Sequence, residues 1–250
     1  MDSSWNEGEN GKAYEKIIRF VKEQIIKGNI KKGERLPPER KLAEGLHVGR
    51  NSVREAMRTL SLMGFISSTQ GSGNYISCDF EKSLTESLSM LFLLGQVEYS
   101  EIAEVRQTLE TQSVRLASER IRPEHLQRLK EIVAEMRSGT DESYNAALDK
   151  ELHLIIADAS ENWLILHILQ ALIETYDQFI GNLRTQIMMT ECKEEMQHNH
   201  EEIVAALCEH DGKRAVQAML AHFEMVDLAI KFGISEMYDT PPSMISLSVE

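Results

Sequence analysis

The sequence has few cysteines and no long hydrophobic run. Its three cysteines form no CxxC pair and are odd in number, which argues against a disulfide framework or a cysteine zinc site and favours a reducing compartment. No stretch of about 18 uninterrupted apolar residues occurs, so no transmembrane helix is expected. The N-terminus lacks a basic segment followed by an apolar one, so no secretory signal is expected. We therefore expect a cytoplasmic protein.

The chain as a whole also lacks positive charge, since its net charge is −13 over 250 residues. Residues 1–79 contain 13 Lys and Arg against 10 Asp and Glu, whereas residues 80–250 contain 14 against 30. The length allows one large or two modest domains. A mildly basic head joined to an acidic remainder is a hint of nucleic-acid binding, although a surplus of three charges is also compatible with an ordinary surface.

Residues 12–78 have the pattern of a winged helix-turn-helix. Apolar residues recur at helical spacing in segments 14–25, 38–46 and 53–60. The segment 65–76 has apolar ends and a glycine-rich middle, QGSGN, which predicts a hairpin. Three helices followed by a hairpin form a winged helix, in which the start of the third helix enters the major groove of DNA.

The polar residues around this third helix suit DNA recognition. Arginine can pair bidentately with guanine, and asparagine with adenine. Arg40, on the preceding helix, suits a phosphate, and the wing tip could let the backbone approach the minor groove. The alternative is that these side chains are only solvated surface. The candidate DNA-binding residues are Arg40, Arg50, Asn51, Ser52, Arg54, Gln70 and Gly71.

The stretch GERLPPERKLAEGLHVGRNSVREAMRTLSLMGFISSTQGSGNYI resembles the DNA-binding domain of the GntR family of bacterial transcription regulators. It contains, in order, a Leu-Pro-x-Glu-Arg turn, a Val-Arg-Glu-Ala helix and a Gly-x-Gly wing. The resemblance implies DNA contacts from the three arginines above, Gln70 and Gly71. One departure is Gly49, where the family usually has Ser or Thr; a hydroxyl that contacts phosphate is absent here.

The remainder of the chain predicts an all-α bundle. Residues 84–232 show helical periodicity and no strand signals, and turn residues divide them into about six to seven helices. Asn162 is a good N-cap for one of these helices. The chain is therefore mainly α. We expect a disordered N-terminus at 1–11, a linker at 79–83 and a C-terminal tail at 233–250.

Three histidines and one aspartate stand on the apolar faces of these helices: Asp149, His153, His200 and His222. Taken singly, each histidine would be a hydrogen-bonded core residue, and Asp149 with His153 a buried ion pair. A divalent metal accounts for all four together, because an unpaired buried carboxylate is costly and residues one turn apart can chelate from one face. Imidazoles and a carboxylate suit Zn²⁺, and also Ni²⁺ or Mn²⁺.

This half of the chain resembles the FCD domain, the helical effector-binding domain of the FadR subfamily of the GntR family. In metal-binding members an Asp-x₃-His is followed by a His three residues before an aliphatic residue and by a His in the last helix, which the four residues above match. The resemblance implies a homodimer, a bound divalent metal with zinc as first choice, and a small carboxylic-acid effector. Acyl-CoA is not expected, because the subfamily member that binds it lacks this metal set.

Arg106 is the candidate for binding the effector. It faces partly inward, and a guanidinium pairs bidentately with a carboxylate; the alternative is an i, i+4 pair with Glu110. Asn182 and Arg184 are weaker candidates.

We therefore predict a metabolite-responsive transcription regulator that binds double-stranded DNA. We expect a repressor and not an enzyme. Two alternatives remain. The metal could be purely structural, or it could polarise a water in a hydrolase or lyase. Catalysis would need a general base, for which Glu151 and Glu174 are the nearby carboxylates.

Overall fold

The structure divides into two units, residues 1–87 and 88–250, each with its own set of contacts. It is a computed structural model, and it describes residues 7–69, 73–79, 81–139, 141–180 and 193–238. Among the helices in these ranges, none combines the length and the apolar character that a membrane span requires.

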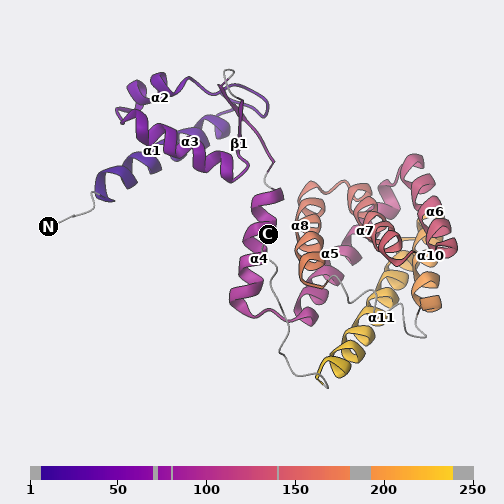
Figure 1. Cartoon of the computed structure of the whole chain (residues 1–250). Helices are drawn as coiled ribbons and strands as arrows, with labels where there is room; N and C mark the ends of the chain where they lie inside the picture. The colour runs from indigo at the N-terminus through magenta and orange to yellow at the C-terminus, as the bar shows by residue number, and fades with distance from the viewer. Residues whose placement is uncertain (1–6, 70–72, 80, 140, 181–192, 239–250) are drawn as a thin grey trace. The chain divides into compact units, whose positions relative to one another are not determined.

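The first unit is the predicted winged helix-turn-helix (Figure 1). It consists of α1 (Glu7–Ile26), α2 (Glu39–Leu46), α3 (Arg50–Leu62), β1 (Ile66–Thr69) and β2 (Gly73–Ile76). Its core is apolar because the helices present their predicted stripes to one another, and it includes Ile17, Val21, Leu42, Val53, Ala56, Met57, Leu60 and Ile66.

The wing is an antiparallel pair with Ile66 opposite Ile76 and Thr69 opposite Gly73. Arg35 adds an isolated bridge to Tyr75 on the other side of β2. Gly73 is required where it stands: its φ is +109°, and a Cβ there would lie 2.8 Å from Nε of Arg35. The arginine side chain thus lies against Gly73 at the tip end of β2.

The second unit is helical throughout its described part. In chain order the helices are α4 (Glu81–Gly95), α5 (Tyr99–Arg120), α6 (Pro123–Ser138), α7 (Glu142–Ala159), α8 (Trp163–Ile180), α10 (Lys193–Cys208) and α11 (Gly212–Tyr238), with α4 crossing the boundary between the units. Helix α5 packs against α7, α8 and α11, and α10 packs against α6 and α11. The core between them contains Leu129, Ile132, Leu152, Ile156, Ile203, Leu207, Met219 and Phe223.

The element ends differ from the expected ones in three places. Helix α1 already begins at Glu7, inside the segment expected to be disordered, and α4 begins at Glu81, inside the expected linker. Helix α11 continues through Gly233 to Tyr238. Apolar periodicity marks only the packed part of a helix, so it does not predict the polar first turns of α1 and α4. A glycine within a helix costs only about 1 kcal/mol, so Gly233 does not end α11.

The predicted cap of α8 is present. The backbone N–H of Ile165 donates to Oδ1 of Asn162 at 3.2 Å. This bond satisfies one of the N–H groups that the first turn of a helix leaves without an intrahelical partner.

Candidate metal centre and nucleic-acid interface

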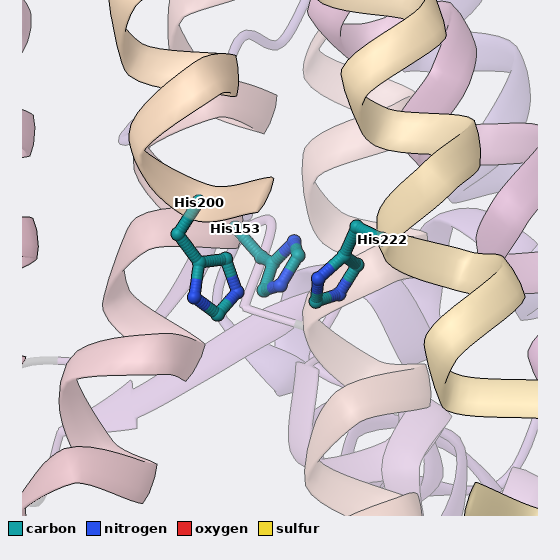
Figure 2. Close-up of side chains that lie close together, drawn as sticks. All are labelled: His153, His200 and His222. Carbon is teal, nitrogen blue, oxygen red and sulfur yellow. The ribbon is translucent and has the colours of Figure 1, made fainter. Parts of the chain in front are cut away.

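Three helices bring His153, His200 and His222 together in the interior of the second unit. His153 comes from α7, His200 from α10 and His222 from α11, and Figure 2 shows the three rings close together. All three side chains are buried, and one nitrogen of each lies within 4.8 Å of one nitrogen of each of the others. The three histidines, which stand on apolar stripes in the sequence, are therefore neighbours in the folded protein.

The three rings lie almost as close together as imidazoles that bind one metal ion. The ring centroid of His222 is 4.9 Å from that of His153 and 4.7 Å from that of His200. The His153 and His200 centroids are 5.9 Å apart. Zinc–nitrogen bonds are about 2.0–2.1 Å long, so two nitrogens on one ion lie about 3.0–3.4 Å apart. Small side-chain shifts would close the cluster around a metal.

Asp149 lies at the edge of this cluster, one turn before His153 on α7. Its Oδ1 is 3.0 Å from Nε2 of His200 and 4.0 Å from Nε2 of His153. The side chain retains 23% of its exposure. One carboxylate oxygen therefore adjoins two of the three imidazoles, although Asp149 is not part of the three-histidine group itself.

The surroundings of His222 favour a neutral ring. Burial, together with the charges of His200 and His153, lowers its pKa well below the usual value. Among the residues that the structure describes, its buried Nδ1 has no hydrogen-bond partner, which costs about 1–3 kcal/mol when nothing else satisfies the atom. A neutral, buried imidazole beside two others is a donor set that fits a divalent metal.

Two residues of α5, Arg106 and Glu110, form an ion pair beside this histidine cluster. Nε and Nη2 of Arg106 donate to Oε1 of Glu110 at 3.0 and 2.9 Å, so the i, i+4 pair is present. The other oxygen, Oε2, contacts Nδ1 of His153. Burial by itself raises the pKa of Glu110, but the charges and hydrogen bonds of His153 and Arg106 outweigh burial and lower it. These two partners therefore favour the charged form of Glu110 despite its burial.

Residues predicted to contact DNA surround the start of α3. Arg50, Asn51 and Arg54 on α3 and Arg40 on α2 are exposed. Arg54 lies 3.7 Å from Glu39, and Arg40 lies 3.8 Å from Glu44. Such exposed pairs contribute little, about 0–1 kcal/mol. Either arginine can therefore leave its carboxylate for a phosphate or a base at small cost.

Comparison with known proteins identifies both units. Residues 13–76 match the family model of bacterial regulatory proteins, gntR family, and residues 101–225 match that of the FCD domain. Over 81% of its length the chain is 31% identical to the HTH-type transcriptional regulator LutR of Bacillus subtilis (strain 168), of which it covers 94%. The chain belongs to the GntR family.

Other members of the family agree with this assignment. The chain is 27% identical to the putative L-lactate dehydrogenase operon regulatory protein of Escherichia coli (strain K12), over 87% of its own length and 86% of that protein. The solved structure of Streptococcus agalactiae GntR superposes with a TM-score of 0.59 at 27% identity, covering 86% of this chain and 98% of that one. This GntR-family protein is a transcription regulator with an FCD effector domain, not an enzyme.

One of the expected DNA contacts, Ser52, does not face outward on α3. Ser52 is buried, with 9% exposure, because it stands four residues before Ala56 on the face that packs into the head of this GntR-family regulator. Gly49 is the N-cap residue of α3 and provides no side-chain cap. Gln70 and Gly71 of the wing lie outside the described residues, as do Asn182 and Arg184.

The carboxylates considered as a general base are engaged elsewhere. Glu151 receives two hydrogen bonds from Arg128, at 2.7 and 2.8 Å, on the side of α7 that faces α6. Glu174 accepts a hydrogen bond from Gln170 on α8 at 3.4 Å. Neither supplies a base beside the histidines of this regulator.

Sequence reasoning missed the contact between Glu110 and His153. Glu110 was considered only as a partner of Arg106. The available signal was its spacing, since Glu110 stands four residues before Val114 and seven before Ala117, both of which are buried. A carboxylate on that face of α5 must find a partner inside the domain.

Proposed function

We propose that this regulator senses a small carboxylic acid through a divalent metal held in its FCD domain, and that it acts as a repressor. The observation that carries the proposal is the convergence of three buried histidines from three helices on one point. Buried imidazole nitrogens need partners, and one metal ion between the three rings would satisfy a nitrogen of each.

The residues that would hold the metal are His153, His200 and His222, with Asp149 as the fourth ligand. Zinc is the first choice, and nickel or manganese also suit this donor set. When bound, the metal supplies positive charge and open coordination positions. A carboxylate entering beside it would meet the exposed side of Asp149, which is the accessible edge of the cluster.

The effector class follows from this chemistry. A 2-hydroxy acid offers a carboxylate and a hydroxyl from adjacent carbons and therefore suits two neighbouring positions on one ion. The name of the E. coli relative refers to an L-lactate dehydrogenase operon, so L-lactate is the first compound to test. A guanidinium has five N–H donors, so Arg106 would bind the acid's carboxylate while it keeps its hydrogen bonds to Glu110.

The regulator would act as a homodimer on a palindromic operator in the bacterial cytoplasm. Each head offers one α3, and helix-turn-helix proteins read two half-sites with two such helices. Helix α4 offers an apolar surface for a second copy: Met90, Leu91, Leu93 and Leu94 are all more than half exposed. Four large apolar side chains on one short helix are more than scattered surface residues would account for.

Metal analysis of the purified protein tests the site. We expect about one equivalent of metal per chain in the wild type and a strong loss in His153→Ala and His222→Ala. His198→Ala is the matched control, because His198 stands on α10 two residues before His200 but is exposed. Undiminished metal in the first two variants, or an equal loss in the control, would overturn the proposed site.

A further inference from the structure

The buried carboxylate of Glu110 connects two functional groups of the effector domain. It stands on α5, which provides none of the proposed metal ligands, and only 1% of its side chain is exposed. Its two oxygens serve different partners. Oε1 accepts both hydrogen bonds from Arg106, and Oε2 faces Nδ1 of His153.

The contact with His153 determines which ring nitrogen is available to a ligand. A neutral imidazole has one N–H donor and one acceptor nitrogen. A carboxylate can only accept, so Glu110 requires the proton of His153 on Nδ1. The acceptor is then Nε2, and a metal binds the acceptor nitrogen. Nε2 of His153 is also the nitrogen near Oδ1 of Asp149, at 4.0 Å.

The position of His200 supports a metal site on the Nε2 side of His153. Its Nε2 approaches the same Oδ1 of Asp149, at 3.0 Å. Nε2 of His153 and Nε2 of His200 therefore face one carboxylate oxygen from two helices. If the proton of His153 were on Nε2, an N–H group would point into this space and block a metal.

Arg106 fixes the carboxylate from the opposite side. Its guanidinium lies over the ring of Phe223, 5.8 Å from the centroid, and Phe223 is the neighbour of His222 on α11. Two hydrogen bonds to Oε1 leave Oε2 directed at His153. The chain Arg106–Glu110–His153 thus ties the candidate effector clamp to a metal ligand.

We infer that Glu110 is a positioning residue of the metal centre: it holds the proton of His153 on Nδ1, presents Nε2 to the metal, and links the centre to Arg106. The inference rests on the proposed metal site. Carboxylates that accept from a ligand histidine in this way set both its tautomer and its orientation, and their loss lowers metal affinity about 10–100-fold.

The substitution Glu110→Gln tests this role. The two oxygens of Glu110 face different partners. Glutamine has one side-chain oxygen, so only one of these positions keeps an acceptor, and the NH₂ group faces the donor at the other. We expect the affinity for Zn²⁺ of the full-length protein to fall about 10–100-fold, measured by competition with a chromophoric chelator. Glu151→Gln is the matched control, since Glu151 is also paired with an arginine but lies away from the histidines; its affinity should equal that of the wild type.

A second measurement uses the wild type and does not depend on how well the variant folds. In the ¹⁵N NMR spectrum of the Zn²⁺-loaded, histidine-labelled protein, His153 should carry its proton on Nδ1 and bind through Nε2. Binding through Nδ1, or a folded Glu110→Gln protein with wild-type Zn²⁺ affinity, would overturn the role of Glu110 alone. A wild type that binds no Zn²⁺ would overturn the metal site and this inference together.

Discussion

At the scale of single residues, the proposed site consists of polar groups buried among apolar side chains. His222 has a depressed pKa because burial disfavours its charged form and two other imidazoles adjoin it. Glu110 keeps its charge in the core because Arg106 and His153 both face it. Buried polar groups cost stability unless they are paired, so their concentration at one place supports the proposed binding site.

Arg50 is the residue on which specific DNA recognition should depend most. It is the first residue of α3, where a recognition helix meets base edges. A lost bidentate contact with guanine costs about 1–3 kcal/mol, so Arg50→Ala should lower specific affinity about tenfold or more. Gel shifts on an operator selected by the wild type from random DNA measure this.

Arg19→Ala is the control for that experiment. Arg19 is exposed on α1, outside the helix-turn-helix motif. Its replacement by alanine removes the same charge from the head as Arg50→Ala does. Wild-type affinity in Arg50→Ala, or equal weakening in Arg19→Ala, would contradict a base-reading role for Arg50.

Helical periodicity predicted that all four proposed metal ligands face inward. The structure buries His153, His200 and His222, whereas the Asp149 side chain is 23% exposed. Periodicity could not predict the contact of Glu110 with His153, because α5 and α7 are joined only by tertiary packing. The prediction that Ser52 faces outward was wrong. A small polar side chain in the mainly polar first turn of a helix does not indicate which face it occupies.

At the scale of elements, α7, α10 and α11 carry the three histidines of the proposed metal centre, and α5 packs against α7 and α11. Their existence and order were predictable from the apolar stripes, since most helical stability in proteins comes from packing such a face. Their ends were less predictable: the polar first turn of α1 and Gly233 in α11 show no apolar period although both are helical. The wing was predictable from its glycines, but the bridge from Arg35 was not.

Helix α4 should form part of the dimer interface. Leu94 is 79% exposed, so Leu94→Glu should leave the fold of the single chain unchanged. Loss of a buried leucine costs about 1.5–3 kcal/mol, and the added charge costs more, so dimer dissociation should become about tenfold or more easier. Sedimentation equilibrium across a range of protein concentrations measures the change.

Lys82→Ala is the matched control on the same helix. It lowers the net charge by one, as Leu94→Glu does, and the Lys82 side chain is 89% exposed. A wild type that is monomeric at every concentration, or an equally weakened dimer in both variants, would show that the apolar residues of α4 do not hold two copies together.

At the scale of the whole molecule, the charge is divided between the two functions. The mildly basic head suits the phosphate backbone of DNA, and the strongly acidic remainder is repelled by it. Direct attraction to DNA is therefore not expected of the effector domain. In the proposed function, its influence comes from a difference in effector affinity between a conformation that fits the operator and one that does not.

The most direct test of metal-dependent acid sensing is the affinity for labelled operator DNA, followed by fluorescence anisotropy. It should be measured with and without L-lactate and other 2-hydroxy acids, on protein loaded with Zn²⁺ and on the same protein after chelation. We predict that an active acid weakens DNA binding about 5–150-fold, the range of a coupling energy of about 1–3 kcal/mol, and that chelation or His222→Ala removes this effect. An acid that weakens DNA binding equally in the metal-free protein, or loaded protein whose DNA affinity no acid changes, would contradict the account.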